Sequence, residues 1–431
     1  MSGERKRKVA YFYDRDVGSV YYGHKHPMKP HRLTMTHHMV VNYGLHKFME
    51  VYKPRRAYPT ELASFHTPEY INFLATATPW NLNELKEESL QYNINDDCPV
   101  FDGLYDFCRL YAGASIEAAN KINNGMCDIA INWSGGLHHA KKGEASGFCY
   151  VNDLVLAILE LLKVHARVLY IDIDIHHGDG VEEAFYLSDR VMTVSFHMHG
   201  NFFFPGTGDI TDIGEKHGRY YSLNVPLAGG VDNATFHRLF KPIMRDVIAS
   251  FQPGAIVLQC GADSLAGDRL GMFNLTIEGH AEAVNYMKGF NIPMIVTGGG
   301  GYTKTNVARC WCFETAKLVG QDIPSDIPAN DVYYDYYAPG HQLNLGWSRQ
   351  DLSNHNPLTE QHNILEKITE NLRRLQHAPG VQMKEMPPAA FLPEYQAPEG
   401  DDMDKRLTKY AVDHGVVRED EFYDNPMGLL D

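Results

Sequence analysis

A stretch of eleven residues at positions 170–180, YIDIDIHHGDG, combines the pattern of a buried strand with side chains that bind metal ions. Isoleucine occupies every second position, as on one face of a strand, and the other face carries Asp172, Asp174 and His176. A buried charge is costly unless it is paired or coordinates a metal, so these residues indicate chemistry rather than packing. Asp174 and His176, together with Asp263 from a later loop, form a set of two carboxylates and one imidazole. Three such ligands with a position left for water are typical of a catalytic Zn²⁺ site.

The sequence favours one metal ion over two. Dinuclear manganese hydrolases of the arginase kind have the pattern Asp-x-His-x-Asp at such a site, whereas this chain has Gly178 in place of the last acid. Asp172 and Asp179 are then available to accept hydrogen bonds from histidines. The adjacent pair His138 and His139, in a glycine-rich loop after another strand, can donate them. Two loop histidines without a catalytic role are the alternative for the pair; for Asp172 the alternatives are support of the strand end and binding of a monovalent cation.

Four glycines at 298–301 precede Tyr302 and could belong to a phosphate-binding loop. The pattern G-x4-G-K-[ST] requires glycine at the position of Thr303, so we reject that interpretation. Glycine allows the backbone to approach another group closely. We therefore expect the run to pass close to the metal and to place the Tyr302 hydroxyl where it can donate a hydrogen bond to a developing oxyanion.

Strand-like and helix-like segments alternate along the chain and must position these residues. We expect strands at 9–13, 129–133, 168–175, 191–196, 255–260 and 293–297, and helices at 153–163, 181–187 and 235–251, the last capped by Asn233. Apolar strands that alternate with helices predict a parallel sheet covered on both faces. Sites in such sheets form beyond the carboxyl ends of the strands, where the opening stretch and the segments 132–150, 259–265 and 297–303 fall. The sequence therefore predicts a single α/β catalytic domain.

Composition argues against several classes of protein. The 431 residues are 44% hydrophobic and 22% charged, as in a soluble globular chain, and no apolar run reaches the ~18 residues of a membrane helix. The N-terminus MSGERKRKV lacks the apolar segment of a secretory signal, and we interpret its basic cluster as a solvated terminus in preference to a nuclear import signal. Seven cysteines without a C-x-x-C pair indicate reduced thiols in a cytosolic or nuclear protein. The net charge of −15 argues against direct nucleic-acid binding and favours cationic partners.

The C-terminal part of the chain differs from the rest. Apolar residues between 364 and 375 predict an amphipathic helix packed on the domain. After the Ala-Pro-Gly sequence at 378–380, the chain is acidic, interrupted by proline and poor in aliphatic residues. We therefore expect a catalytic domain at 1–380 and a disordered acidic tail at 381–431, which either solubilises the chain or binds a partner.

Five long motifs resemble those of class I zinc-dependent histone deacetylases, in the arginase–deacetylase superfamily. They are NWSGGLHHAKKGEASGFCYVND, LYIDIDIHHGDGVEEAFY, FFFPGTGD, QCGADSLAGDRLG and GGGGYT, which begin at positions 132, 169, 202, 259 and 298. The similarity extends from position 8 to about 380, and within the class it is greatest to the histone deacetylase 3 subtype. The resemblance implies a single domain with an eight-stranded parallel sheet and helices on both faces. It also implies a nuclear hydrolase, with a cytoplasmic pool as a further expectation, that removes acetyl groups from lysine side chains of histones and other proteins and represses transcription.

The resemblance also assigns roles to individual residues. The ligands of one Zn²⁺ would be Asp174, His176 and Asp263, and the catalytic residues would be His138, His139, Asp172, Asp179 and Tyr302. Of the two histidines, we expect His139 to take the proton of the attacking water and His138, beside Asp172, to stay more cationic. A narrow substrate tunnel would be walled by Gly147, Phe148, Phe204 and Leu270, with Asp97 at its rim. Two structural K⁺ ions would be held by Asp172, Asp174, His176, Ser195 and Phe196, and by Phe185, Ser188, Val191 and Tyr221.

The partners implied by the resemblance are acetylated histone tails and corepressor proteins, with no membrane. An inositol phosphate is a further expected partner, because Lys29 and Arg269 match a basic cluster near the tunnel. That match is incomplete, since Tyr21 stands where the subtype has histidine and Thr305 where the class often has arginine. Two alternatives remain open: an amidohydrolase of small acetylpolyamines in the same superfamily, and an inactive scaffold in a corepressor complex. The intact metal set and Tyr302 argue against the scaffold.

Overall fold

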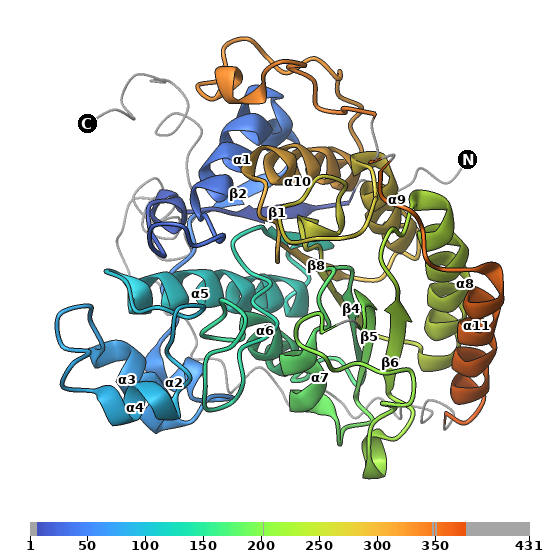
Figure 1. The fold of residues 1–431 in the computed structure, drawn as a ribbon, viewed down its shortest axis with the longest axis horizontal. Helices are drawn as coiled ribbons and strands as arrows, with labels where there is room; N and C mark the ends of the chain where they lie inside the picture. Colours follow the sequence, from blue (N-terminus) through green and yellow to red (C-terminus); the bar gives the residue numbers. More distant parts are fainter. Residues whose placement is uncertain (1–6, 201, 347–348, 350, 376–431) are drawn as a thin grey trace, which may run out of the picture.

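Eight strands form one sheet in the order β2-β1-β3-β8-β7-β4-β5-β6, and every neighbouring pair is parallel (Figure 1). The computed structural model describes residues 7–200, 202–346, 349 and 351–375. The strands are β1 (Val9–Phe12), β2 (Glu50–Tyr52), β3 (Ile129–Asn132), β4 (Val168–Asp172), β5 (Val191–Met198), β6 (Ser222–Leu227), β7 (Ala255–Gln259) and β8 (Met294–Thr297). The expected eight-stranded parallel sheet is confirmed.

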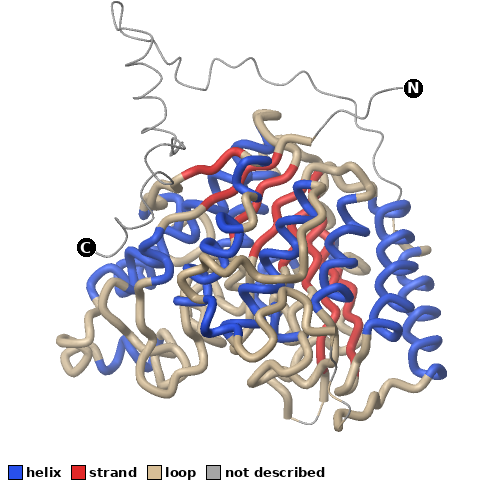
Figure 2. Tube along the Cα trace, turned by 90° about the horizontal axis from the view of Figure 1, so that it is seen from above, coloured by secondary structure: helices blue, strands red, loops and turns tan. Residues whose placement is uncertain are grey.

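Helices make up much of the remaining described chain and lie on both sides of the strands (Figures 1 and 2). They are α1 (His31–Asn42), α2 (Pro59–Leu62), α3 (Pro68–Thr76), α4 (Lys86–Gln91), α5 (Leu104–Asn123), α6 (Asp153–Leu161), α7 (Asp179–Phe185), α8 (Asn233–Phe251), α9 (Ile277–Lys288), α10 (Lys304–Val319) and α11 (Leu358–Leu372). Within the described part of the chain, none of these helices has both the length and the apolar character needed to cross a membrane.

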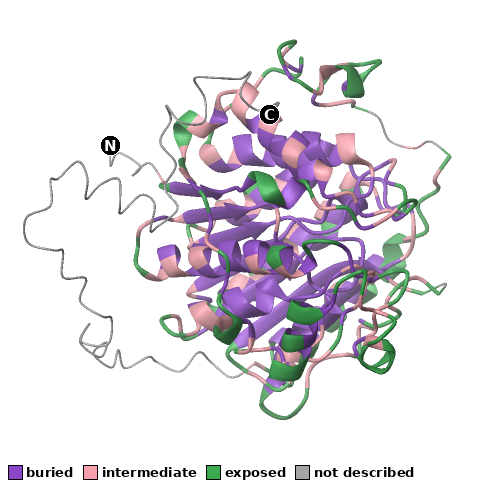
Figure 3. Cartoon of the chain, turned by 90° about the vertical axis from the view of Figure 1, so that its left-hand side faces the viewer, coloured by how far each residue is buried: buried purple, intermediate pink, exposed green. Residues whose placement is uncertain are grey.

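The sheet is buried on both faces because successive side chains of a strand point to opposite sides. In β4, Leu169 and Ile171 pack in one apolar cluster with side chains of α8, α9 and α10. Val168 and Tyr170, on the opposite face, pack in a second cluster with side chains of α6 and α7. Figure 3 shows the buried residues filling the middle of the molecule and the exposed ones on the outer loops and helix faces. All seven cysteines are unpaired and buried, as expected for reduced thiols.

The strand expected at 168–175 is shorter than predicted, because β4 ends at Asp172. The Asp172 carboxylate accepts a hydrogen bond from Asp174 N at 3.1 Å, and the Asp174 carboxylate accepts one from His176 N at 2.9 Å. An aspartate that binds the backbone N–H two residues later forms a turn and removes that N–H from the sheet. Asp174 and His176 therefore lie in a turn after the strand and not on its face.

Two further expectations concern helix ends. The cap of α8 is Asp232 and not Asn233, because the Asp232 carboxylate accepts a hydrogen bond from Thr235 N at 2.8 Å. The amphipathic helix expected near 364–375 is present as α11, which begins earlier, at Leu358, and packs beside α8 at the edge of the molecule (Figure 1). The tail expected at 381–431 lies outside the described residues.

Candidate metal centre and active site

Four neighbouring strands bring the candidate residues together. β3, β8, β7 and β4 are adjacent in the middle of the sheet. The segments that follow them carry, in the same order, His138 with His139, then Tyr302, then Asp263, then Asp174 with His176. Because the strands are parallel, their carboxyl ends meet at one edge of the sheet, where sites of open α/β folds form.

Asp174, His176 and Asp263 converge on one point. His176 Nδ1 lies 3.0 Å from Asp174 Oδ1 and 3.0 Å from Asp263 Oδ2, and the three ligand atoms lie within 4.8 Å of one another. The two aspartates are fully buried. Two carboxylates and one imidazole at these separations are a donor set that Zn²⁺ accepts.

The carboxylates of Asp174 and Asp263 favour a positive charge between them. Burial opposes the charging of His176, yet hydrogen bonds to Asp174 and Asp263 raise its pKa to about 10. Burial and the neighbouring Asp174 carboxylate together raise the pKa of Asp263, because two like charges lie close together. A divalent cation relieves this repulsion and takes the place of the His176 proton. The residues present therefore fit a divalent metal ion.

Backbone groups approach the two carboxylates as expected from the glycine run. Gly300 N donates to Asp174 Oδ2 at 2.8 Å, and Ile175 N donates to Asp263 Oδ1 at 3.1 Å. A Cβ added at Gly300 would lie 2.0 Å from Asp263 Oδ2 and 2.9 Å from Asp174 Oδ2. Only glycine allows the chain to pass this close to the carboxylates.

The acid of a dinuclear site does not fit at position 178. A Cβ added at Gly178 would lie 2.3 Å from Asp172 Oδ2 and 3.1 Å from the Tyr170 hydroxyl. A larger side chain there would displace Asp172, whose Oδ2 already accepts hydrogen bonds from Tyr170 and His138. The geometry favours one metal ion over two.

Each histidine of the adjacent pair is held by its own carboxylate. His138 Nδ1 lies 2.7 Å from Asp172 Oδ2, and His139 Nδ1 lies 2.7 Å from Asp179 Oδ1. The His138 Nε2 atom lies 3.8 Å from Asp174 Oδ2, so the pair adjoins the metal ligands. A carboxylate on Nδ1 fixes the ring orientation and directs Nε2 away from it, towards the centre of the site.

The two imidazoles have opposite pKa shifts. Burial by itself lowers the pKa of His138, but the carboxylates of Asp172 and Asp174 outweigh it and raise the pKa to about 9. Burial and the neighbouring His138 lower the pKa of His139 to about 3, against the attraction of Asp179. The carboxylates therefore favour the positive charge on His138, and that charge disfavours a second one on the adjacent His139 ring.

Aromatic side chains lie next to these polar groups. The Phe148 ring lies 5.8 Å from that of Tyr302, and the Phe204 ring lies 4.9 Å from that of His139, both edge to face. Gly147 has a φ of 50°, and a Cβ there would lie 2.5 Å from the His139 ring and 2.9 Å from the Phe204 ring. Position 147 therefore requires glycine, both for its backbone conformation and for the space between two rings.

Comparison with known proteins decides the family. Residues 26–318 match the family model described as the histone deacetylase domain. The chain belongs to the histone deacetylase family. It is 58% identical over 419 residues to histone deacetylase 9 of Arabidopsis thaliana, and the alignment covers 97% of each chain. It is 54% identical over 420 residues to histone deacetylase 1 of Homo sapiens, an alignment that covers 97% of this chain and 86% of the relative. It is 53% identical over 420 residues to type-1 histone deacetylase 1 of Dictyostelium discoideum, which covers 97% of this chain and 84% of the relative.

In this histone deacetylase, three of the residues expected to contact substrate, Asp97, Phe204 and Leu270, are exposed at the surface. Asp97 is exposed; its N–H donates to Asn95 Oδ1 at 2.8 Å, and its carbonyl lies 3.1 Å from His26 Nε2. Leu270 and Phe204 are 38% and 44% exposed, although the histidines and metal ligands are buried. The expected substrate residues thus extend from the surface to the buried centre.

The residues expected to bind K⁺ in the deacetylase occupy two places beside β5. Asp172 is directly opposite Ser195 in the β4–β5 register, and Ser195 Oγ accepts a hydrogen bond from Gly178 N at 3.4 Å. Phe185 O accepts a hydrogen bond from Ser188 N at 2.9 Å just before β5. The first expected set is Asp172, Asp174, His176, Ser195 and Phe196, and the second is Phe185, Ser188, Val191 and Tyr221; binding of K⁺ by either set stays a prediction.

The basic residues expected to bind an inositol phosphate lie on separate loops. Lys29 Nζ donates to Gly23 O at 3.2 Å and lies 5.1 Å from the Tyr21 ring centroid. Arg269 is exposed, and Thr305 is partly buried in the first turn of α10.

Several side chains that support the site were not predicted. Gln259 Nε2 donates to Asp174 Oδ2 at 2.9 Å, and Lys141 Nζ lies 2.7 Å from Asp179 Oδ2. Phe203 stacks on the ring of His176 with centroids 5.0 Å apart. Lys141, Phe203 and Gln259 all lie within the five motifs, so their proximity to predicted residues in the sequence was the available signal.

Arg32 and Asp268 bind the backbone around Tyr302. The Arg32 guanidinium donates to Gly301 O at 2.6 Å and to Gly299 O at 2.5 Å. The Asp268 carboxylate accepts from Tyr302 N at 2.7 Å. Asp268 lies within the motif QCGADSLAGDRLG, whereas no pattern in the sequence connects Arg32 with a loop some 270 residues later.

Proposed function

We propose that this chain is a zinc-dependent hydrolase that removes acetyl groups from lysine side chains of histones and other proteins, and so represses transcription. The observation that carries the proposal is the buried cluster of Asp174, His176 and Asp263 next to two histidines that each bind a carboxylate. Family membership supports the substrate class, because the relatives that align over nearly the whole chain are named histone deacetylases.

Asp174, His176 and Asp263 would hold Zn²⁺, which supplies Lewis acidity for the acetyl carbonyl and for the attacking water. His139 accepts the proton of that water at Nε2, because Asp179 binds its Nδ1–H and leaves Nε2 as the unprotonated nitrogen. Its Nδ1–H bond to Asp179 stabilises the imidazolium that results.

Tyr302 and His138 stabilise the charge that forms next. Addition of the water oxygen to the acetyl carbon gives a tetrahedral oxyanion, to which the Tyr302 hydroxyl donates a hydrogen bond; burial raises the pKa of this hydroxyl well above its usual value, so it stays protonated. The His138 ring adjoins the metal ligands, with its Nε2 3.8 Å from Asp174 Oδ2. The carbon–nitrogen bond then breaks, the lysine nitrogen receives a proton from a histidine of the pair, and acetate and the free amine leave.

The surrounding residues support binding of an extended acetyl-lysine side chain. Gly147, Phe148, Phe204 and Leu270 would wall a tunnel for its methylene groups, and Asp97 at the rim would accept a hydrogen bond from the peptide backbone. Two structural K⁺ ions would occupy the places beside β5.

Further parts of the proposal concern partners and regions outside the site. We infer a catalytic domain at 1–380, a location in the nucleus with a cytoplasmic pool, and corepressor proteins as partners. Inositol phosphate binding through Lys29 and Arg269 is included, although Tyr21 and Thr305 reduce the positive charge of that surface. Titration of inositol hexakisphosphate into enzyme and corepressor tests it, and an unchanged activity would count against it.

The central experiment is an assay of metal-stripped protein, with and without Zn²⁺ restored, on an acetyl-lysine histone peptide and on an acetylpolyamine. We expect acetate release from the peptide only when metal is present, and no recovery in Asp263→Asn. Preference for the acetylpolyamine would identify a small-molecule amidohydrolase instead. No turnover of either substrate, with and without corepressor, would identify a scaffold.

A further inference from the structure

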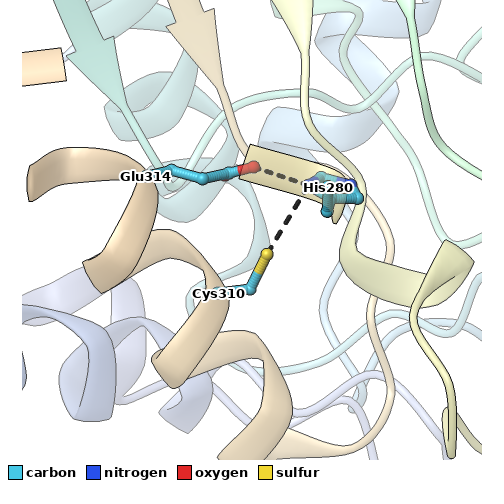
Figure 4. A group of neighbouring side chains, drawn as sticks. All are labelled: His280, Cys310 and Glu314. Carbon is cyan, nitrogen blue, oxygen red and sulfur yellow. Dashed lines mark hydrogen bonds and ion pairs between the residues drawn. The ribbon is translucent and has the colours of Figure 1, made fainter. Parts of the chain in front are cut away.

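A second buried group of metal-binding residue types lies behind the candidate metal centre. His280 comes from α9, and Cys310 and Glu314 lie one turn apart on α10 (Figure 4). None of the three is exposed. They take no part in the proposed reaction, so their role requires a separate explanation.

The distances in this group are those of hydrogen bonds and not of metal ligands. His280 Nδ1 lies only 2.5 Å from Glu314 Oε1, whereas two ligand atoms that each lie ~2.0–2.1 Å from a tetrahedral Zn²⁺ are separated by about 3.3 Å. At the candidate metal centre, by contrast, His176 Nδ1 lies 3.0 Å from Asp174 Oδ1 and 3.0 Å from Asp263 Oδ2. Burial also raises the pKa of the Cys310 thiol well above its usual value, so the thiolate that a metal requires is disfavoured.

The other nitrogen of His280 binds the loop that carries a predicted metal ligand. His280 Nε2 lies 2.9 Å from the carbonyl oxygen of Gly261, two residues before Asp263. A carbonyl oxygen only accepts, so Nε2 must carry a proton. The Glu314 carboxylate accepts a hydrogen bond from Nδ1–H and raises the pKa of His280 against the effect of burial, which favours the imidazolium form with both nitrogens protonated. The neighbouring carbonyl of Cys260 accepts from Trp311 Nε1 at 2.8 Å, so two successive carbonyls are anchored to helices behind the sheet.

Gly261 lies directly between His280 and the metal ligands. A Cβ added at Gly261 would lie 2.0 Å from Asp174 Oδ2, so its backbone is in contact with one ligand while its carbonyl is bound to His280. Ala262 N donates to Gly300 O at 3.0 Å and fixes the same loop from the β8 side. A shift of Gly261 would therefore change the position of Asp263 relative to Asp174.

We propose that His280 and Glu314 form a positioning pair, in which Glu314 keeps His280 Nε2 protonated and His280 holds the Gly261 carbonyl so that Asp263 meets the metal correctly. The inference rests on the proposed function, because it assumes that Asp174, His176 and Asp263 bind the metal. It adds two residues that touch neither metal nor substrate to the set that determines metal affinity.

The test is the Zn²⁺ affinity of metal-free full-length protein, measured by competition with a chelator, together with the visible spectrum of the Co²⁺-loaded protein. The double variant His280→Leu/Glu314→Leu removes both polar partners and so leaves no unpaired buried charge that would unfold the domain. We expect its affinity for Zn²⁺ to fall about tenfold, as on loss of groups that orient metal ligands, with an altered Co²⁺ spectrum. In the single variant Glu314→Gln, the amide can donate a hydrogen bond to His280 Nδ1, so this variant should keep most of the wild-type affinity for Zn²⁺.

Two controls separate the outcomes. Asp263→Asn should lose the metal; if it binds Zn²⁺ like the wild type, the proposed metal centre is wrong, whatever the double variant does. Cys310→Ala should bind one equivalent of Zn²⁺ with wild-type affinity. If the wild type binds two equivalents and this variant only one, then His280, Cys310 and Glu314 form a metal site and the positioning role is wrong. Wild-type affinity and spectrum in the double variant, with metal lost in Asp263→Asn, would refute the positioning role alone.

Discussion

Replacement of Asp268 by asparagine tests whether one buried carboxylate holds the loop of Tyr302. Asp268 is 7% exposed and accepts four backbone hydrogen bonds. Oδ2 accepts from Tyr302 N at 2.7 Å and Thr303 N at 3.2 Å, and Oδ1 accepts from Leu270 N at 2.9 Å and Gly271 N at 3.1 Å. The carboxylate therefore joins the segment of the proposed oxyanion donor to the turn that carries Leu270.

An asparagine at this position satisfies only half of these donors. Its oxygen can replace one carboxylate oxygen, but its NH₂ group then faces the two N–H groups on the other side. Hydrogen bonds to a charged group contribute about 1.5–3 kcal/mol each, so the loss of two should lower the free energy of unfolding by at least about 3 kcal/mol. If the amide faces Tyr302, the loop moves and kcat should fall more than KM rises.

Urea-induced unfolding followed by tryptophan fluorescence measures the first effect, and steady-state kinetics on an acetyl-lysine peptide measure the second. The matched control is Asp351→Asn, which makes the same chemical change at an exposed carboxylate bound to Arg349 and should leave the urea midpoint close to that of the wild type. If Asp268→Asn unfolds at the same urea concentration as the wild type, the four hydrogen bonds do not stabilise the loop and the reasoning fails.

Three further predictions follow from the site and its surroundings. Tyr302→Phe should lower kcat by roughly 10²–10³ with little change in KM, because it removes one donor to the oxyanion; an unchanged turnover number in steady-state kinetics would exclude that role. Gly300→Ala should weaken Zn²⁺ binding at least about tenfold in a chelator competition, since its Cβ would lie 2.0 Å from Asp263 Oδ2, and wild-type affinity would contradict the observed packing. Burial lowers the pKa of His66 to about 4, and its Nε2 accepts a hydrogen bond from Asn152 N at 2.9 Å that protonation would break. The unfolded chain, with a pKa of ~6.5, binds this proton more readily than the folded protein does, so stability is lost progressively as the pH falls from 6.5 towards 4. Between pH 7 and pH 5 the wild type should therefore lose about 2 kcal/mol more than His66→Gln, and equal losses in urea titrations would refute this.

The central part of the fold could be predicted from the sequence, whereas its edges could not. In all six expected strands the side chains are buried on both faces, and these strands have a strong apolar signal. The two that were not expected, β2 and β6, are the two edge strands. β2 has three residues and an exposed Glu50, and β6 contains Pro226, a residue that argues against a strand except at an edge. Edge strands are weakly specified by local sequence because only one side is paired.

The same contrast applies to the site. The convergence of Asp174, His176 and Asp263 could be predicted because carboxylates and histidines in a buried apolar setting are rare, and such residues stand out in a single sequence. The exact turn could not, since the expected strand at 168–175 ends at Asp172 when aspartate side chains take over the backbone N–H groups of Asp174 and His176. Local side-chain hydrogen bonds compete with the sheet pattern and leave no periodic signal.

Residues that hold the site act mainly on the backbone, which explains why a single sequence does not show them. Asp174 accepts a hydrogen bond from Gly300 N, and Asp263 accepts one from Ile175 N, so each predicted metal ligand also joins its own loop to a neighbouring one. Arg32, which donates to the carbonyls of Gly299 and Gly301, stabilises one of these loops from outside. Backbone N–H and C=O groups do not depend on the residue type of the partner. A side chain that binds them therefore has no complementary residue in the sequence that would identify the interaction. These backbone contacts matter for the chemistry, because the two aspartates repel each other and must both stay 3.0 Å from His176 Nδ1. The loops that carry them keep this geometry only while the supporting residues satisfy the remaining backbone groups.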